Sequence, residues 1–388
     1  MPPAAGRTLM SMPGSPGDLA RRLLADLVAV PSENPPGRAY DQVQAVLADW
    51  LRRFGVASEM HTVRGKPNLV ARVGCGRPVL LVNGHVDVVP ADAAGWSYPP
   101  YRLTEANGRL YGRGTADMKG ALAAMAVALA VTVQQGGPPR GTIVFTATVD
   151  EETGGHDGLE SLLSSGIADA DWALVGEPTG LEVACCGKGV LQQRVTVTGR
   201  AAHAAMPYLG ANAISAAAEA IRRLEAAEPG VAHPLLGHGT LTVGTIRGGV
   251  AANVVAPECQ FTVDRRLVPG ERVEPIQEEI RRVLHGTVAG MGCRCTVEDI
   301  LVAQPFETPP DAPIVRWAEA ALQALGRSPG EPRGIVAFTD ARFPAARGIP
   351  TIVLGPGRLE QAHGADEYIE EEQLSAAVAL YTRLFQTL

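Results

Sequence analysis

The feature that most constrains this chain is a set of short, almost wholly apolar runs that end abruptly in acidic or histidine residues. The run PVLLVNGHVDVV ends in His85 and Asp87, GTIVFTATVDEE ends in three consecutive acids, and DWALVGEPT carries Glu177 near its end. Apolar runs of this length between helical segments are typical of strands that are buried on both faces of an α/β sheet. Such sheets bind ligands outside the carboxyl ends of their strands. The pattern therefore predicts an α/β sheet with a functional site along one edge.

The helical segments around these runs support the same fold class. The segment from Leu19 to Phe54 has helical apolar spacing that is broken by the loop PSENPPGRAY, and Asn68–Val73 is strand-like. The Ala-rich run ALAAMAVALAVTVQQGG predicts a buried helix that stops at its two glycines. Near the C-terminus we expect a helix at Ala312–Ala324, a strand at TIVLGP and a last helix from Glu371.

The middle of the chain has a different texture. The runs VLQQRVTVTGRAAH, GTLTVGTIRGG and APECQFTVDRRLV alternate like half-exposed strands, and two amphipathic helices lie among them. The order β-α-β-β-α-β over this length is that of a ferredoxin-like unit. We therefore predict a catalytic domain in two parts, 1–183 and 298–388, with an α+β domain inserted at 184–297.

Composition excludes several classes of protein. The chain has 388 residues, 46% of them hydrophobic and 19% charged, with a net charge of −7. This balance argues against a nucleic-acid-binding surface and against disorder. No apolar stretch is long enough to span a membrane. The length favours two domains over one core.

The N-terminus and the cysteines bear on location. Residues 1–17 are rich in Pro and Gly and lack the apolar segment of a signal peptide, so we expect a flexible tail. Six cysteines are too few for a disulfide scaffold and have no zinc-finger spacing. We expect reduced thiols in or near the core and a cytoplasmic protein.

Each polar motif taken alone has an ordinary alternative. His85 and Asp87 share one face of a strand, and such a pair is either a metal ligand with its orienting partner or simply a hydrogen bond. Asp117 precedes a helix, where a carboxylate usually serves only as a cap. The acids after the second strand could form a solvated turn, although like charges at a buried strand end are costly unless a cation neutralises them. His363 lies in a Gly-bounded loop far along the chain.

Together these motifs supply donors for two zinc-like ions that share one carboxylate. Such a pair of ions polarises a carbonyl and activates a water molecule. One acid must stay unligated to accept the proton of that water, and two adjacent acids offer one ligand and one base. The candidates are two histidines and four acids: His85, Asp117, Glu151, Glu152, Glu177 and His363.

At this point a family resemblance is clear. The motifs GHVDVVP, GRGTADMKG, DEETGG, GEPT and AHGADE resemble, in this order, those of metallopeptidase family M20. The resemblance covers nearly the whole chain after the first twenty residues. It implies a zinc-peptidase-like catalytic domain with a mixed central sheet, and it makes the inserted domain similar to the family's dimerisation or lid domain.

The resemblance also implies roles for the candidate residues. His85 and Glu177 would hold one metal, Glu152 and His363 the other, and Asp117 would bridge them. Asp87 would orient His85, and Glu151 would be the general base that later protonates the leaving amine. The family further implies a cis peptide bond between Asp117 and Met118. The metals would be two divalent ions, with Zn²⁺ first and Co²⁺ or Mn²⁺ as alternatives.

Five further residues match substrate contacts of the family. His203 resembles a histidine that crosses a homodimer to stabilise the oxyanion, and Arg265 resembles a partner of a substrate carboxylate. The remaining three, as pocket residues, are Asn253, Thr339 and Gly355. Without the resemblance, His203, Asn253 and Arg265 would be read as a surface histidine, a turn asparagine and an exposed arginine.

The predicted function is a two-metal amidohydrolase of the acetylornithine deacetylase or succinyl-diaminopimelate desuccinylase type. A metal-bound hydroxide would attack the acyl carbonyl of a small N-acyl amino acid. In the family, Glu at position 177 goes with deacylases and carboxypeptidases, and Asp goes with aminopeptidases. Two alternatives remain: a carboxypeptidase or dipeptidase of the same family, and a binding protein that kept the fold without activity.

Overall fold

The computed structural model describes residues 14–227, 230–331 and 333–388. Its contacts divide the chain into two compact units. The first comprises the described residues up to Cys185, together with Thr308–Arg333 and Thr339–Leu388, and the second comprises Cys186–Glu307 and Gly334–Phe338. Most of the predicted N-terminal tail, residues 1–13, lies outside the described residues.

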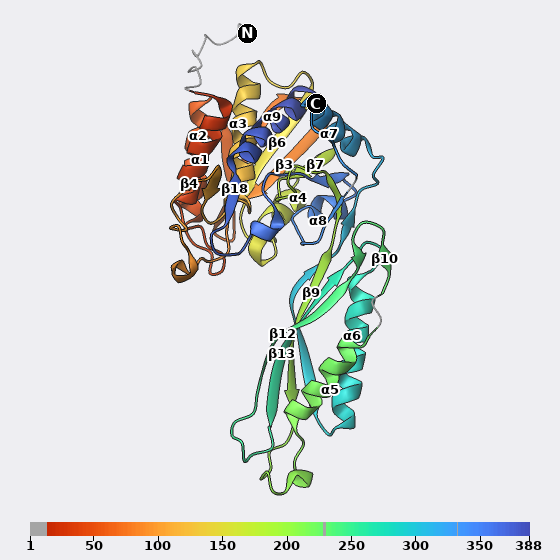
Figure 1. Cartoon of the computed structure of the whole chain (residues 1–388). Helices are drawn as coiled ribbons and strands as arrows, with labels where there is room; N and C mark the ends of the chain where they lie inside the picture. Colours follow the sequence, from red (N-terminus) through yellow and green to blue (C-terminus); the bar gives the residue numbers. More distant parts are fainter. Residues whose placement is uncertain (1–13, 228–229, 332) are drawn as a thin grey trace. The chain divides into compact units, whose positions relative to one another are not determined.

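The first unit is built on a mixed β-sheet, and this agrees with the predicted fold class (Figure 1). Its four central strands run parallel and neighbour one another in the order β6, β3, β7 and β17. Antiparallel strands extend the sheet at both ends. The strands, in sheet order, are β1 (Ser58–Val63), β2 (Lys66–Cys75), β6 (Gly141–Thr148), β3 (Val79–His85), β7 (Trp172–Val175), β17 (Thr351–Val353) and β8 (Ala184–Gly187).

Alternation along these strands divides the core of the first unit into two layers. On β3, Leu80 and Val82 join a large apolar cluster, whereas Leu81 joins a smaller cluster on the opposite face. This is the period-two pattern of a strand that is buried on both sides. The helices that contribute to the large cluster are α1 (Pro16–Val28), α2 (Tyr40–Arg53), α3 (Lys119–Gln134), α7 (Pro313–Ala324) and α9 (Glu371–Gln386). The opposite face carries α4 (Leu159–Ser164) and α8 (Arg342–Ala346).

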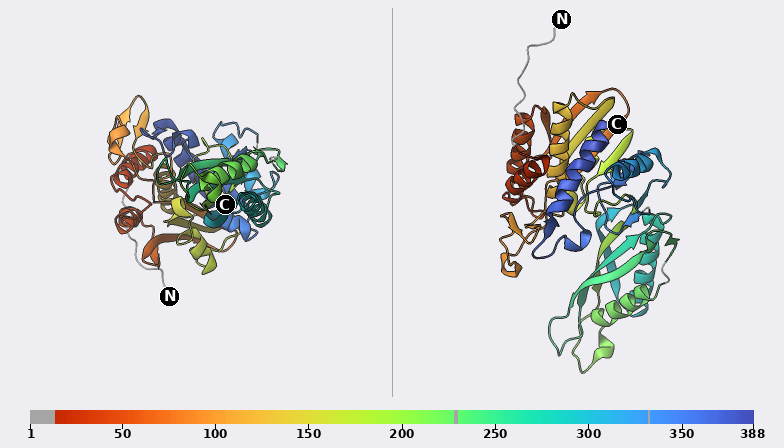
Figure 2. Two further views of the ribbon diagram at one scale, coloured as in Figure 1. Left: turned by 90° about the horizontal axis from the view of Figure 1, so that it is seen from below. Right: turned by 45° about the horizontal axis from the view of Figure 1, so that its top comes forward.

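The buried helix α3 lies between α1 and α9, which both contact it (Figure 2). Because its neighbours and the sheet surround it, all but a few of its residues are buried. This explains why the Ala-rich run has no polar face. The position of α3 matters for function, since it begins directly after Asp117 and Met118.

Helix α1 begins inside the segment that we predicted to be a flexible tail. Ser15 caps the helix through a capping box with Asp18, and Pro16 occupies the first turn. Proline suits that position because its missing N–H would have no partner there. Pro16 and Gly17, which we expected in the tail, are therefore helical.

Several short elements of the first unit were not expected from the sequence. A small antiparallel sheet joins β4 (Thr104–Ala106), β5 (Arg109–Tyr111) and β18 (Tyr368–Glu370). Short 3₁₀ turns also occur in the chain, at Ala93–Gly95 (η1), Glu151–Thr153 (η2), Pro207–Leu209 (η3) and Leu359–Gln361 (η4).

The second unit contains the expected β-α-β-β-α-β order. Its antiparallel sheet has the strand order β12-β13-β9-β14, and α5 and α6 pack side by side against it (Figures 1 and 2). The elements, in chain order, are β9 (Gly189–Thr198), α5 (Ala213–Glu225), β12 (Thr240–Gly248), β13 (Glu258–Leu267), α6 (Val273–Gly290) and β14 (Arg294–Ala303). Strand β14 pairs with β9 as far as Ala303 and so continues past residue 297, where we expected the domain to end.

Small strands complete the second unit. The two-residue strands β10 (Ala232–His233) and β11 (Gly237–His238) pair with each other. In the large sheet, β8 also pairs with β15 (Phe306–Glu307) and β16 (Arg333–Ile335).

None of the six cysteines forms a disulfide bond, as predicted. Five are buried, but Cys75 at the end of β2 is exposed, so the expectation that every thiol lies in or near the core was wrong for this one. Within the described ranges of the chain, no helix combines the length and the apolar character that crossing a lipid bilayer requires.

Candidate metal centre

The candidate site lies where the parallel strands end. His85 is the last residue of β3, and it pairs with Thr148 at the end of β6. Glu151 and Glu152 lie in η2, shortly after β6 ends at Thr148, and Glu177 lies two residues after the end of β7. Since these strands are parallel and adjacent, their carboxyl ends meet at one edge of the sheet and bring the side chains together.

His85 is the centre of this cluster, with only 1% of its side chain exposed. Its Nδ1 lies 2.8 Å from the main-chain oxygen of Asp87 and donates a hydrogen bond to it, which points Nε2 at the acids. Burial by itself lowers the pKa of His85, but the Asp117 and Glu177 carboxylates outweigh it and raise this pKa well above its usual value.

Asp117 lies between the two histidines. Its Oδ1 is 3.0 Å from Nε2 of His85, and its Oδ2 is 3.2 Å from Nε2 of His363. Burial opposes ionisation of Asp117, but the two imidazoles hold its pKa below the usual value. The peptide bond between Asp117 and Met118 is cis, as the family resemblance implied. A carboxylate with one oxygen toward each imidazole has the geometry of a bridging ligand.

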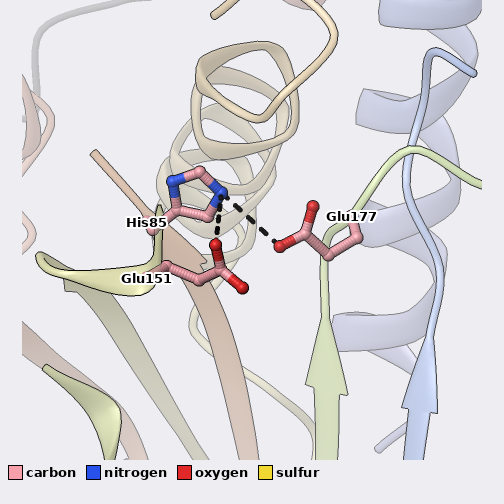
Figure 3. A group of neighbouring side chains, drawn as sticks. All are labelled: His85, Glu151 and Glu177. Atoms are coloured by element: carbon pink, nitrogen blue, oxygen red, sulfur yellow. Dashed lines mark ion pairs between the residues drawn. The ribbon is translucent and has the colours of Figure 1, made fainter. Parts of the chain in front are cut away.

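Glu151 and Glu177 face the same nitrogen of His85 (Figure 3). Glu177 Oε1 is 3.5 Å from Nε2, and Glu151 Oε2 is 4.0 Å from it. Burial, with the nearby Asp117 carboxylate, raises the pKa of Glu177 to about 8, although His85 opposes this shift. Burial also raises the pKa of Glu151 well above its usual value. Both acids therefore hold a proton more readily than an ordinary carboxyl group does.

Glu152 turns to the other histidine. Its Oε2 is 3.2 Å from Nε2 of His363. Hydrogen bonds from the His363 imidazole to the Asp117 and Glu152 carboxylates raise the pKa of His363 to about 10. The other oxygen of Glu152, Oε1, is buried and has no hydrogen-bond partner within the described ranges. An unsatisfied buried carboxylate oxygen is costly, and a cation would satisfy it.

The donor set fits divalent cations. Two groups have ligand atoms within 4.8 Å of one another: His85 with Glu151 and Glu177, and His85 with Asp117 and Glu152. Imidazole nitrogens and carboxylate oxygens are ligands that Zn²⁺ binds. Four carboxylates packed around two imidazoles leave an excess of negative charge, which cations would neutralise.

The contact between Asp87 and His85 differs from the one that we expected, in which the Asp87 side chain orients the imidazole. The carboxylate Oδ1 is 3.7 Å from Nδ1, too far for a hydrogen bond, and the main-chain oxygen of Asp87 is the acceptor. The other oxygen, Oδ2, accepts from Asn34 Nδ2 at 2.9 Å and from the main-chain N–H of Glu152 at 3.2 Å. The side chain of Asp87 thus ties the loop before α2 to the turn that carries Glu152.

Asn34 and Lys66 are supporting residues that the sequence did not single out. Asn34 Nδ2 donates to Thr153 Oγ1 at 2.8 Å as well as to Asp87. Behind the acidic turn, Lys66 Nζ lies 2.6 Å from Asp150 Oδ1 and 2.9 Å from Asp157 Oδ2. Asp150 is therefore held by a lysine and does not belong to the metal donors. Motif spacing contains no signal for these contacts, because each joins distant parts of the chain.

Asp340 is another buried acid that we did not predict from the sequence. It is 1% exposed, its Oδ2 lies 3.5 Å from Thr148 Oγ1, and its Oδ1 is without a partner among the described residues. Burial raises its pKa to about 7, although Arg342 opposes this shift. The acid directly follows Thr339 in the motif FTDAR, which was the available signal.

Thr339 and Gly355 both lie in the first unit and are buried. The Thr339 hydroxyl accepts the main-chain N–H of Ala341 at 3.2 Å, so it stabilises the start of α8. A Cβ added to Gly355 would lie 2.1 Å from the main-chain oxygen of Gly176 and 2.5 Å from that of Glu177. Only glycine permits this close approach. Gly355 therefore packs directly against the segment that carries Glu177.

The other three predicted residues belong to the second unit. His203 is exposed, and its Nδ1 accepts the main-chain N–H of Ala205 at 3.1 Å. Asn253 is exposed in a turn, and its main-chain oxygen accepts the N–H of Ala204. Arg265 is buried, with its NH2 group 2.6 Å from Glu271 Oε1. The structure therefore describes an internal carboxylate partner for Arg265.

Comparison with known proteins agrees with this geometry. The model of peptidase family M20/M25/M40 matches residues 81–387. An acetylornithine deacetylase of Proteus mirabilis is 35% identical over 364 residues, which covers 90% of this chain and 91% of that protein.

Solved structures share the fold across almost the whole chain. An M20 family metallo-carboxypeptidase from Sulfolobus solfataricus superposes with a TM-score of 0.80 at 18% identity, covering 95% of this chain and 98% of that one. A dinuclear metal-binding M20 peptidase from Bacillus subtilis gives a TM-score of 0.70 at 16% identity, covering 96% and 99%. The chain therefore belongs to peptidase family M20/M25/M40 and is, as its sequence predicted, a metal-dependent amidohydrolase.

Proposed function

We propose that this enzyme removes the acyl group from a small N-acyl amino acid, with two divalent cations held by His85, Asp117, Glu152, Glu177 and His363. The observation that carries the proposal is the position of Asp117, whose two oxygens face two different imidazoles at 3.0 and 3.2 Å. The similarity to a deacetylase over nine-tenths of the chain supports the acyl amino acid as substrate. Zn²⁺ is the proposed metal, with Co²⁺ or Mn²⁺ as substitutes.

Bound cations would polarise the amide carbonyl and make a water molecule more acidic. The chain itself would supply the proton carrier. Glu151 is buried beside His85 with a raised pKa, so its carboxylate can accept a proton from water and return it to the leaving amine nitrogen. Asp87 would hold the acidic turn in place through its bond to the N–H of Glu152.

The second unit has proposed roles in substrate binding and assembly. We propose a homodimer in which His203 of one subunit stabilises the oxyanion formed in the other. The exposure of His203 is compatible with this role. Arg265 would receive a substrate carboxylate only in competition with Glu271. Asn253, Thr339 and Gly355 are proposed as further pocket residues. The free thiols support a cytoplasmic location.

The deciding experiment is a panel of N-acetyl and N-succinyl amino acids, assayed with Zn²⁺ or Co²⁺ and again after chelation. Deacylation that disappears with the chelator and returns with metal supports the proposal. Dipeptides that share the C-terminal residue of the best acyl substrate form the second arm. Faster cleavage of the dipeptides would identify a carboxypeptidase or dipeptidase instead. Equal activity in metal-free protein would reject the metal centre.

A loss of activity in His203→Ala, with the dimer and the fold intact, would support the role of His203 across the subunits. A fully active His203→Ala variant would reject that role. The inactive binding-protein alternative predicts no turnover in any arm, although each of the six predicted metal and base residues is present in the chain.

A further inference from the structure

Glu367 stands out among the buried acids because the first unit surrounds its carboxylate with donors. Its side chain is 1% exposed. Oε1 accepts the main-chain N–H groups of Ala116 at 2.9 Å and Asp117 at 3.1 Å. Oε2 accepts the N–H of Gly114 at 3.0 Å and Arg113 NH1 at 2.6 Å. Four donors therefore converge on one carboxylate, and three of them belong to the main chain.

These contacts join two loops that carry candidate ligands. The segment Gly114–Asp117 ends in the acid that faces both histidines, and Glu367 follows His363 by four residues in the other loop. A second set of contacts binds the same two loops: Arg113 NH2 donates to the main-chain oxygen of His363 at 3.3 Å, and Gly112 N donates to that of Glu367 at 2.9 Å.

Helix capping does not account for the arrangement. Helix α3 begins at Lys119, and its N-cap residue Met118 has no side-chain hydrogen bond of the capping kind. The N–H groups that Glu367 accepts lie before the helix, in the turn itself. Because one of them is the N–H of Asp117, the contact determines the backbone position from which the Asp117 side chain projects.

We infer that Glu367 is a positioning residue that holds the Asp117 carboxylate between His85 and His363, and so sets the spacing at which the two cations bind. The inference rests on the proposed two-metal function. It assigns Glu367 no contact with the cations or the substrate. Outer partners of metal ligands orient those ligands, and their loss costs metal affinity.

The test is Glu367→Gln with Zn²⁺ as the only probe. Glutamine keeps the size of the side chain but has one acceptor oxygen and one NH₂ group. Some of the N–H groups that now donate to Glu367 would therefore face the NH₂ group, which is itself a donor. We expect the weaker of the two Zn²⁺ dissociation constants, measured by calorimetric titration of metal-free protein, to rise roughly 10–100-fold.

The matched control is Asp171→Asn. Asp171 also accepts a main-chain N–H, that of Val79 at 2.7 Å, and it also pairs with an arginine, Arg77. It lies beside the start of β3, whereas His85 is at the end of that strand. Asp171→Asn should therefore lower stability while leaving both Zn²⁺ dissociation constants unchanged.

The outcomes separate this inference from the proposed function. If the unmodified protein fails to bind two Zn²⁺ ions, the proposed function fails and this inference with it. If it binds two and Glu367→Gln binds them equally well, only the positioning role is overturned. An equal loss of affinity in Asp171→Asn would also overturn it, because any destabilisation would then suffice.

A measurement on the unmodified protein covers the case in which Glu367→Gln does not fold. Hydrogen exchange in metal-free protein should show strong protection of the N–H groups of Gly114, Ala116 and Asp117. Exchange at the rate of an exposed loop would overturn the inference, since Glu367 would then not hold this turn.

Discussion

His85 and His363 face opposite oxygens of Asp117, yet their surroundings differ. The side chain of His85 is 1% exposed and that of His363 is 54% exposed. His85 ends a central strand of the sheet, whereas His363 lies in a loop after η4 with a positive φ of 62°. The sheet thus positions one half of the candidate centre. The other half lies in loops, and contacts with other parts of the chain must hold these loops in place.

The difference shows how the centre depends on distant contacts. In the sheet half, hydrogen bonds between β3, β6 and β7 place His85 and Glu177. In the loop half, the position of His363 depends on Arg113, which donates to its main-chain oxygen. We expect the sheet half to tolerate loss of outer contacts better than the loop half.

The largest expected effect concerns Glu151, which could be either the base or a third ligand beside His85 and Glu177. If it is the base, Glu151→Gln should lower kcat by roughly 10²–10⁴-fold, the usual contribution of general acid–base catalysis, with both metals retained. Turnover and elemental analysis of the same sample would measure this. Loss of one metal ion would instead show that Glu151 is a metal ligand in the half of the centre that the sheet positions.

The second prediction compares the two histidines in metal-free protein. His85→Ala removes a buried partner of three acids and should lower the free energy of unfolding by roughly 3 kcal/mol, in the range for breaking buried ion pairs. His363→Ala removes a half-exposed partner and should cost less than about 1 kcal/mol. Urea denaturation with a chelator present would measure both. Equal losses would contradict the distinction between the halves.

The third prediction tests the support of Asp87. Asn34→Ala removes the donor to Asp87 Oδ2 and to Thr153, so the turn that carries Glu152 should loosen. We expect the Zn²⁺ affinity to fall by about 10-fold, the lower end of the range for such outer partners. Gln44→Met is the control, because the buried Gln44 amide donates only to main-chain oxygens. Unaltered affinity in Asn34→Ala would show that Asp87 needs no such anchor.

The last prediction concerns Lys66, which pairs with Asp150 behind the acidic turn. Burial alone raises the pKa of Asp150, but Lys66 and neighbouring donors hold it below the usual value. A pKa that is lower in the folded state stabilises that state fully at pH values above the pKa of the unfolded state, which is near 4. This stabilisation is lost as the pH falls through the pKa of the folded state. Lys66→Met should cost about 1–2 kcal/mol at pH 7, between exposed and buried pairs.

The measurement for Lys66→Met is the free energy of unfolding between pH 7 and pH 3. The difference from the unmodified protein should shrink as the pH falls below about 4, where Asp150 becomes protonated in the unfolded state first and in the folded state only at lower pH. A difference that stays constant over this range would mean that Lys66 acts through packing and not through its charge.

The long elements were predictable because their periodicity extends over many residues. The helix expected at Ala312–Ala324 begins one residue later, at Pro313, and the last helix begins at Glu371 as predicted. The strands β4, β5 and β18 were missed because each has only three residues, too few to show alternation. Helices α4 and α8, with six and five residues, were missed because they are too short to show a helical period.

The candidate site divides in a similar way. All six proposed metal and base residues were candidates from the sequence, since each is a polar residue at a strand end or in a Gly-rich loop. It did not predict their supports, Asn34, Lys66, Asp340 and Glu367. Asn34 and Lys66 have no motif around them, whereas Asp340 and Glu367 lie in the motifs FTDAR and AHGADE, which do not reveal the contacts that these two acids make.

By itself the sequence determined which strands are buried, where they end and which donors stand there, because those properties depend on neighbouring residues. Only the tertiary structure decided how the donors are held. It made the main-chain oxygen of Asp87 the partner of His85, gave Arg265 an internal partner in Glu271, and surrounded Glu367 with the N–H groups before Asp117. The physical reason is that all of these contacts depend on the three-dimensional position of the backbone, and that the contact of Glu367 joins groups 250 residues apart in the chain.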